Sequence, residues 1–109
     1  MSEEAVEWHA VAKLSELEDE EPEHSRIGDT LVCVVKLEDD IYAINDVCTH
    51  EFALLSEGFV DDGEIECPLH QARFNLKSGK CTALPAEQDV ASYPVKVEGD
   101  QVYVGLPKA

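Results

Sequence analysis

The sequence predicts an all-β fold, because short apolar stretches alternate with turn-forming residues along the chain. The clearest stretch is residues 30–37, TLVCVVKL, whose length and valine content predict a buried strand. Residues 93–98 and 101–104 flank Gly99-Asp100, which predicts a hairpin with a two-residue loop. No segment has the periodicity of a long amphipathic helix. The 109 residues therefore predict one all-β domain, a sandwich or a barrel.

The N-terminal part of the chain predicts a strand, a short helical turn and an acidic loop. Residues 6–11 roughly alternate between apolar and polar and predict a strand, and residues 14–17 predict a helical turn with both leucines on one face. Residues 16–23, ELEDEEPE, contain six acidic residues and a proline, which predicts a solvated loop. After the valine-rich strand, residues 38–40 predict a turn, and residues 41–44 predict the return strand of a first hairpin.

Two shorter alternating stretches lie in the second half of the chain. Residues 64–67 and residues 73–76 each predict a strand, and Ser78-Gly79 predicts a turn after the second of them. The chain contains no internal repeat. Many short strands with regularly spaced turns are typical of an antiparallel β-sandwich or barrel.

Charge and cysteine content restrict the possible partners and compartment. The 24 acidic and 8 basic residues give a net charge of -16, which argues against nucleic acid or an anionic membrane as partner. Such a surface suits docking onto basic patches of another protein, and high solubility alone is the alternative. No apolar stretch approaches the length of a membrane span, and the start MSEE lacks the basic residues of a signal peptide. We therefore expect a cytoplasmic protein, whose four cysteines are metal ligands or buried thiols.

Two short motifs each combine one cysteine with one histidine. They are C-T-H at residues 48–50 and C-P-L-H at residues 67–70, separated by sixteen residues, and each follows a predicted strand. Two cysteines and two histidines can hold one zinc ion or two irons bridged by sulfide. Zinc motifs usually pair like with like, whereas mixed motifs suit a [2Fe-2S] centre in which two thiolates bind one iron and two imidazoles bind the other. We favour the [2Fe-2S] centre, with a mononuclear zinc site and four unrelated residues as the alternatives.

The pattern C-T-H, sixteen residues, C-P-x-H resembles that of the Rieske [2Fe-2S] family. Residues 55–58 (LSEG), 64–66 (EIE) and 74–79 (FNLKSG) look like the corresponding segments of small soluble Rieske ferredoxins. Those ferredoxins carry electrons to bacterial aromatic-ring-hydroxylating dioxygenases. The resemblance covers residues 30–104, so the acidic N-terminal loop lies outside it.

The resemblance implies the ligands of one [2Fe-2S] cluster. Cys48 and Cys67 would bind the inner iron, and His50 and His70 would bind the outer iron at the protein surface. A third loop, residues 84–86 (LPA), would cap the cluster.

The resemblance also implies the domain organisation. The chain would be a single Rieske domain over residues 1–109, with an antiparallel β-sandwich as its base. Residues 1–44 and 84–109 would form this basal sandwich, and residues 45–83 would form a small cluster-binding subdomain inserted between basal strands.

The function implied is that of a one-electron carrier and not of an enzyme, because the chain has no room for a catalytic mononuclear-iron domain. Its partners would be an NAD(P)H-dependent flavoprotein ferredoxin reductase and a terminal Rieske non-haem iron oxygenase, and the carrier would be a monomer. One alternative is a small Rieske-type subunit of a larger oxidoreductase such as a nitrite reductase. A zinc-bound structural module is another. The aromatic substrate is not readable from this chain, because that specificity belongs to the oxygenase.

The remaining cysteines, histidines and aromatic residues carry no assigned chemistry. Cys33 lies inside the valine-rich strand and is expected to be a core thiol, and Cys81 is expected to be structural as well. His9 and His24 have no companion in the sequence and are expected to be surface residues. The aromatic residues expected in the core or as shields are Trp8 and Phe59.

Overall fold

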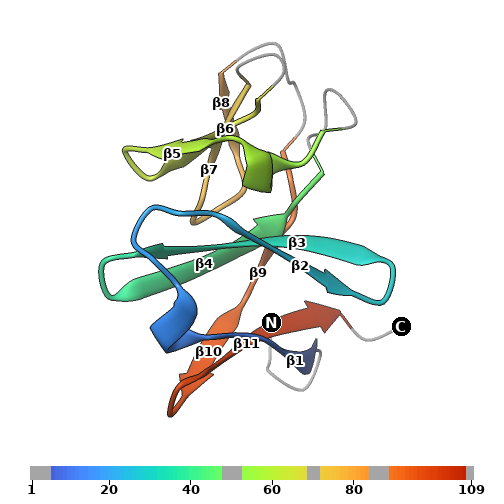
Figure 1. Ribbon diagram of the computed structural model, residues 1–109. Helices are drawn as coiled ribbons and strands as arrows, with labels where there is room; N and C mark the ends of the chain where they lie inside the picture. Colours follow the sequence, from blue (N-terminus) through green and yellow to red (C-terminus); the bar gives the residue numbers. More distant parts are fainter. Residues whose placement is uncertain (1–5, 48–52, 69–71, 84–88, 108–109) are drawn as a thin grey trace.

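The computed structural model describes residues 6–47, 53–68, 72–83 and 89–107. Its strands form three sheets, and every strand pair is antiparallel. Figure 1 shows the three sheets stacked one above another. We call them the base sheet, the middle sheet and the upper sheet, in the order in which they lie from the bottom of Figure 1. The all-β prediction is therefore confirmed.

The base and middle sheets contain strands from both halves of the sequence. The base sheet has the order β1-β11-β10, with β1 at Val6–Lys13, β10 at Val95–Glu98 and β11 at Gln101–Pro107. The middle sheet has the order β2-β3-β4-β9, with β2 at Glu23–Ile27, β3 at Thr30–Leu37, β4 at Asp40–Asn45 and β9 at Ser92–Tyr93.

The upper sheet is built from one continuous part of the chain. It has the order β5-β6-β7-β8, with β5 at Phe59–Asp61, β6 at Glu64–Glu66, β7 at Arg73–Asn75 and β8 at Cys81–Ala83. Two 3₁₀ turns, η2 (Leu14–Glu16) and η3 (Leu55–Glu57), supply the helical structure of the described residues, where no helix is long and apolar enough to span a membrane.

The middle sheet is covered on both faces, which explains the valine-rich sequence of β3. Val32 and Val34 face the base sheet, in a lower core that also contains Val102 and Val104. Cys33, Val35 and Leu37 face the upper sheet. Because side chains alternate along a strand, a strand between two cores needs apolar residues at successive positions.

The upper core lies between the middle and upper sheets. Phe74, Ile44 and Ile65 are fully buried there. The buried members of this core are Cys33, Val35, Ile44, Leu55, Ile65, Cys67, Ala72, Phe74, Leu76 and Val90.

Most of the predicted strands are confirmed, with one correction at Pro94. The hairpins β3–β4 and β10–β11 form as expected, and Glu98 pairs with Gln101 across the two-residue loop. The single strand predicted over residues 93–98 is wrong. Tyr93 belongs to β9 in the middle sheet, whereas β10 belongs to the base sheet. Pro94 has no N–H to donate, so the chain changes sheets there, and its carbonyl oxygen accepts a hydrogen bond of 2.9 Å from the N–H of Gly105.

Two further differences concern polar or weakly patterned segments. The strands β2, β5 and β8 were not predicted; β2, with the sequence EHSRI, is an edge strand without the apolar alternation that identifies a strand. The acidic residues of the predicted loop at 16–23 are exposed as expected. Leu17, however, is buried in the lower core.

The chain returns from the upper sheet to the middle sheet through residues 89–91. The N–H of Val90 donates to the carbonyl oxygen of Gly79 (2.9 Å), and the N–H of Asn45 donates to that of Ala91 (2.8 Å). Gly79 has a φ of +78°, and a Cβ built on it would lie 2.1 Å from the carbonyl oxygen of Val90. Only glycine permits both this backbone conformation and this close approach.

We predict that Gly79→Ala destabilises the fold by about 3 kcal/mol, because it adds left-handed backbone strain to a clash with a neighbouring carbonyl. Gly99→Ala is the matched control, since Gly99 has a φ of +62° with nothing within 4 Å of its added Cβ. It should cost about 1–2 kcal/mol. Denaturant unfolding followed by circular dichroism measures both, and equal losses would contradict the importance of the contact at Val90.

Candidate metal centre

The second cysteine–histidine motif begins directly after strand β6. Glu66 pairs with Arg73 across the β6–β7 hairpin, and the N–H of Cys67 donates to the carbonyl oxygen of Ala72 at 2.7 Å. This hydrogen bond joins the two ends of the segment 67–72. His70 lies within residues 69–71, outside the described residues.

The side chain of Cys67 is 1% exposed and belongs to the upper core. Leu55, Ile65 and the fully buried Ala72 belong to the same core. A thiolate in such apolar surroundings is costly unless a cation compensates its charge. The position therefore suits a sulfur bound to a metal and shielded from water.

The first motif lies in a loop whose ends are also joined. Val47 and Leu54 form an isolated antiparallel bridge, so the chain leaves and re-enters at neighbouring points. Cys48 and His50 lie within residues 48–52, outside the described residues. We call residues 47–54 the first ligand loop.

The buried residue Asp46 holds the two ends of the first ligand loop together. The N–H of Leu55 donates to its main-chain oxygen (2.7 Å). The N–H of Ser56 donates to Oδ1 (2.6 Å), and the hydroxyl of Ser56 donates to Oδ2 (2.7 Å). Nδ1 of His24 lies 2.6 Å from Oδ2 and donates to it, because a carboxylate can only accept. We call His24, Asp46 and Ser56 the Asp46 clamp.

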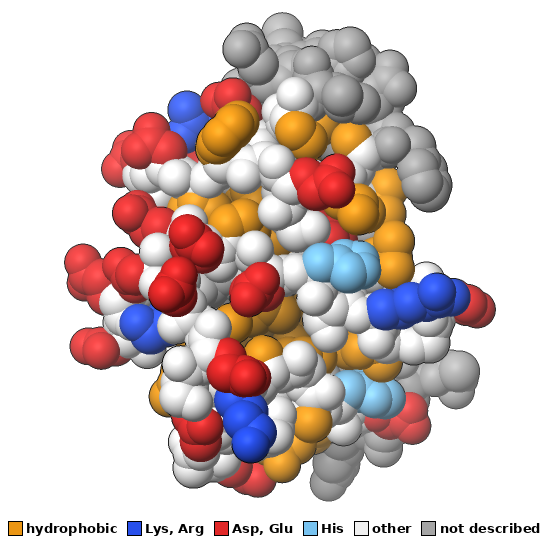
Figure 2. Space-filling view, in the orientation of Figure 1, with side chains coloured by type: hydrophobic (Ala, Val, Ile, Leu, Met, Phe, Trp, Pro, Cys, Tyr) orange, Lys and Arg blue, Asp and Glu red, His pale blue; other side chains and the backbone are white. Residues whose placement is uncertain are grey.

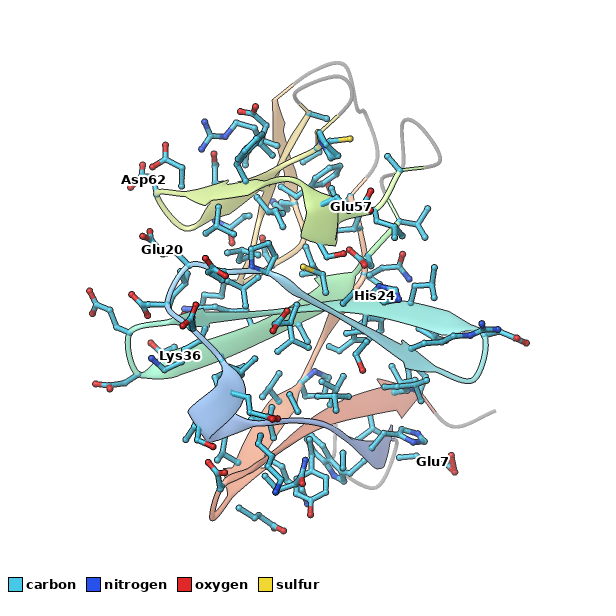
Figure 3. The ribbon with its side chains drawn as sticks, in the orientation of Figure 1. Glu7, Glu20, His24, Lys36, Glu57 and Asp62 are labelled. Carbon is cyan, nitrogen blue, oxygen red and sulfur yellow. The ribbon has the colours of Figure 1, made fainter. Side chains whose placement is uncertain are left out.

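The Asp46 clamp lies between the middle sheet and the turn η3. Figure 3 shows His24 at the level of the middle sheet, below Glu57 of η3. Asp46 itself is 0% exposed, and its N–H donates to the carbonyl oxygen of Leu31 (2.9 Å). The clamp therefore ties the middle sheet to the turn that follows the first ligand loop.

The segment that follows the first ligand loop packs against the residue before the second motif. A Cβ built on Gly58 would lie 1.9 Å from the carbonyl oxygen of Glu66, so the chain after the first ligand loop packs against the residue before Cys67. Ala53 also packs against the core that contains Cys67. The segment after the first ligand loop and the start of the second motif therefore belong to the same packed unit.

Of the four predicted ligands, the structure places Cys67 and leaves the other three outside the described residues. Within the described part of the chain, no three cysteine, histidine or acidic side chains are grouped as metal ligands. The set Cys48, His50, Cys67 and His70 therefore stays a prediction. The buried sulfur and the joined ends of both loops fit a [2Fe-2S] centre, which needs thiolates in dry surroundings and loops that converge.

The predicted third loop, residues 84–86, also lies outside the described residues. The N–H of Cys81 donates to Oδ1 of Asp89 at 2.8 Å. Together with the Val90–Gly79 hydrogen bond, this contact joins the two sides of the segment 82–88 at its base.

Cys33 is a core thiol, as the sequence predicts. It is fully buried in the upper core on β3. Burial raises the pKa of Cys33 well above its usual value, and the negative charges of Asp46 and Glu23 raise it further. The thiol therefore stays protonated and chemically inert in the folded protein.

Two expectations about single residues need correction. His24 lies at the surface as predicted, with a side chain that is 39% exposed, but it has a partner, because it binds the buried Asp46 from strand β2. Phe59 was expected to pack, but its side chain is 67% exposed, because Val60 is the β5 residue that packs against the upper core. The sequence predicts no role for Asp46 or Ser56. The motif LSE, which contains Ser56, also occurs at residues 14–16 and is the one local signal for this contact.

Comparisons with known proteins agree with this geometry. The family described as Rieske [2Fe-2S] domain matches residues 7–94. The ferredoxin subunit of anthranilate 1,2-dioxygenase from Burkholderia cepacia is 35% identical over 101 residues, which are 93% of this chain and 94% of that protein. The ferredoxin component of the naphthalene 1,2-dioxygenase system from Pseudomonas aeruginosa is 41% identical over 89 residues, which are 78% of this chain and 86% of that protein.

Solved structures give the same result for the fold. The ferredoxin of carbazole 1,9a-dioxygenase from Nocardioides aromaticivorans IC177 superimposes with a TM-score of 0.88 at 38% identity, over 93% of this chain and 98% of that one. A ferredoxin solved in complex with the oxygenase of carbazole 1,9a-dioxygenase has a TM-score of 0.86 at 33% identity, over 94% and 95% of the two chains. A nitrite reductase small subunit from Mycobacterium tuberculosis, with a TM-score of 0.86 over 95% and 98%, is 21% identical, which shows a common fold alone.

We predict that iodoacetamide does not alkylate Cys33 in the folded protein at neutral pH, because its thiol is buried and protonated. The same thiol should react after unfolding in urea. Peptide mass mapping measures both states, with the partly exposed Cys81 as the internal comparison. Equal labelling of Cys33 in the folded and unfolded protein would contradict its place in the core.

Proposed function

Because this chain belongs to the Rieske family of [2Fe-2S] domains, we propose that it is a soluble ferredoxin that passes single electrons from an NAD(P)H-dependent flavoprotein reductase to a terminal aromatic-ring-hydroxylating oxygenase. It holds one [2Fe-2S] cluster, and it is an electron-transfer component, as are its dioxygenase ferredoxin relatives. The observation that carries the proposal is this similarity over nearly the whole chain, together with all four cysteine and histidine residues of the two motifs.

In the proposed site, Cys48 and Cys67 bind the inner iron, and His50 and His70 bind the outer iron. The burial of Cys67 in the upper core supports its assignment to the inner iron. The cluster, when bound, takes up one electron and gives it up again. The chain's own residues bind it, keep water away from its thiolate side and hold the two loops in place.

We further propose that residues 45–83 form a cluster-binding subdomain and that residues 1–44 and 84–109 form the basal sandwich. The sheet composition supports this division. The upper sheet is formed within residues 59–83, whereas the other two sheets combine segments from residues 6–45 and 92–107.

Ala72 and Phe74, which follow the second motif, have no hydroxyl group that could donate a hydrogen bond to the cluster. Ala72 and Phe74 are both fully buried and belong to the same core as Cys67. Hydrogen bonds to the cluster sulfurs or their ligands raise the potential of a Rieske centre. We therefore place the potential of this protein near the low end of the Rieske range, roughly -150 mV, which suits electrons that originate on NAD(P)H.

The proposed partners follow from the relatives and from charge. A related ferredoxin has been solved in complex with an oxygenase, which supports an oxygenase as electron acceptor. The reductase, a monomeric state in solution and a cytoplasmic location are parts of the proposal. With a net charge of -16, the protein suits partners with basic docking surfaces and not nucleic acid.

Acidic side chains gather along one edge of the molecule, at the left of Figure 2. A hollow there is lined by Asp19, Glu20, Glu38 and Asp40, from the loop before β2 and the β3–β4 turn. Such a surface accelerates encounters with a basic partner and weakens as salt screens it.

The small-subunit alternative rests on a shared fold alone, because the nitrite reductase neighbour is 21% identical. The zinc-module alternative disagrees with the family of the chain. Purification distinguishes all three readings. A free red-brown protein with iron and acid-labile sulfide supports the ferredoxin, whereas a colourless protein or a stable larger complex contradicts it.

We predict that alanine at any of the four proposed ligand positions removes or cripples the cluster, because an iron left with one protein ligand is open to exchange and hydrolysis. Iron and acid-labile sulfide content after anaerobic purification measures this loss. Cys33→Ser is the matched control, since Cys33 is equally buried but lies on β3 in the middle sheet. If one of these variants keeps near wild-type iron, the assignment of that residue as a ligand is contradicted. The variants are Cys48→Ala, His50→Ala, Cys67→Ala and His70→Ala.

We also predict that Ala72→Ser raises the reduction potential, because it adds a hydroxyl donor beside Cys67 in the upper core. Voltammetry of the purified protein measures the shift. Ala43→Ser is the control, because Ala43 is equally buried but belongs to the lower core. An unchanged potential in Ala72→Ser, or the same shift in both variants, would contradict a local hydrogen bond to the site.

A further inference from the structure

The chain builds the same serine–aspartate contact twice. At η2, the N–H of Leu14 donates to the main-chain oxygen of Asp100 (2.7 Å). The N–H and the hydroxyl of Ser15 donate to the two carboxylate oxygens of Asp100, at 2.9 and 2.8 Å. At η3, Leu55 and Ser56 make the same three contacts to Asp46. Both turns have the sequence LSE.

The two copies differ in burial and in their third partner. Asp100 lies at the exposed tip of the β10–β11 hairpin, whereas Asp46 is completely buried. His24 from strand β2 binds Asp46 in addition. A buried carboxylate needs more hydrogen bonds than an exposed one, because water cannot solvate it. The copy near the ligand loop is therefore the one in which losing a partner is most costly.

The copy at Asp46 lies at the two ends of the first ligand loop. Asp46 is two residues before the proposed ligand Cys48, and Ser56 follows the Val47–Leu54 bridge by two residues. On the other side of the loop entry, the N–H of Val47 donates to Oδ1 of Asn45 at 3.0 Å. Both ends of the loop are thus held by side chains that do not belong to the four proposed ligands.

His24 connects this loop to an edge strand of the middle sheet. Its side chain is 39% exposed, so its contribution is the hydrogen bond and not core volume. Without it, the hydroxyl of Ser56 is the partner of Oδ2 of Asp46 that remains among the described residues. The histidine is therefore the member of the clamp that can be removed with the least effect on packing.

We propose that His24, Asp46 and Ser56 are positioning residues of the cluster site, which hold the first ligand loop in the geometry that cluster retention requires. The inference rests on the proposed function. It assigns a role in the site to a histidine that lies in a different sheet from either motif. Residues that orient metal ligands from behind typically change metal affinity or activity by roughly 10–100-fold when they are mutated.

The test compares His24→Ala and Ser56→Ala with Ser15→Ala, which removes the matching hydroxyl from the exposed copy. The readouts are the rate of cluster bleaching by an iron chelator, the electron paramagnetic resonance spectrum of the reduced protein and the thermal unfolding midpoint. We expect the two clamp variants to lose the cluster roughly tenfold faster or more and to show shifted or broadened resonances. Ser15→Ala should lower the midpoint while keeping wild-type bleaching and spectrum.

His24→Asn is the rescue variant, because the amide nitrogen of asparagine can occupy the place of Nδ1 and donate to Asp46. It should restore the wild-type rate and spectrum. Wild-type bleaching and spectrum in His24→Ala would overturn the inference, as would equal acceleration in Ser15→Ala and Ser56→Ala. If Ser56→Ala does not fold, the comparison of His24→Ala with His24→Asn tests the inference without it. A wild-type chain that takes up no cluster would instead overturn the proposed function, and the inference with it.

Discussion

The buried carboxylate of Asp46 is the interaction on which the upper half of the molecule depends. Its hydrogen bonds reach β2 through His24, η3 through Ser56 and β3 through the main chain of Leu31. Leaving a buried charged group without one of its hydrogen-bond partners costs about 1–3 kcal/mol or more, so these segments are coupled. The first ligand loop therefore starts and ends at points fixed by the middle sheet.

The second constraint is the middle sheet, which serves two cores at once. Because β3 alternates between them, one continuous upper core contains both Cys33 and Cys67. The proposed inner iron would thus be bound on the apolar side of its loops. Buried Ala72 and Phe74 keep hydroxyl groups away from that side, which favours a low potential. The upper core that stabilises the sheets would then also help to set the reduction potential of the cluster.

The sequence predicts secondary structure best where a residue type favours a single backbone conformation or environment. The valine-rich β3 and the turn at Gly99 were predicted with their correct neighbours, because apolar runs and turn residues act locally. The edge strand β2 was not, because its residues are polar and its pairing partner determines its conformation. The Asp46 clamp escaped detection because nothing local distinguishes one buried aspartate among 24 acidic residues. Likewise, two cysteine–histidine pairs identify the kind of site, whereas the partner of His24 lies 22 positions away and depends on packing.

The central claim is that two mixed cysteine–histidine loops on this scaffold hold one [2Fe-2S] cluster with chemically different irons. Mössbauer spectroscopy of protein enriched in ⁵⁷Fe tests it most directly. The oxidised protein should show two distinct iron sites in equal amounts, one with thiolate and one with imidazole ligands, and reduction should localise the added electron on the imidazole site. Two equivalent irons, as in a cluster bound by four cysteines, or a protein that contains no iron would contradict the account.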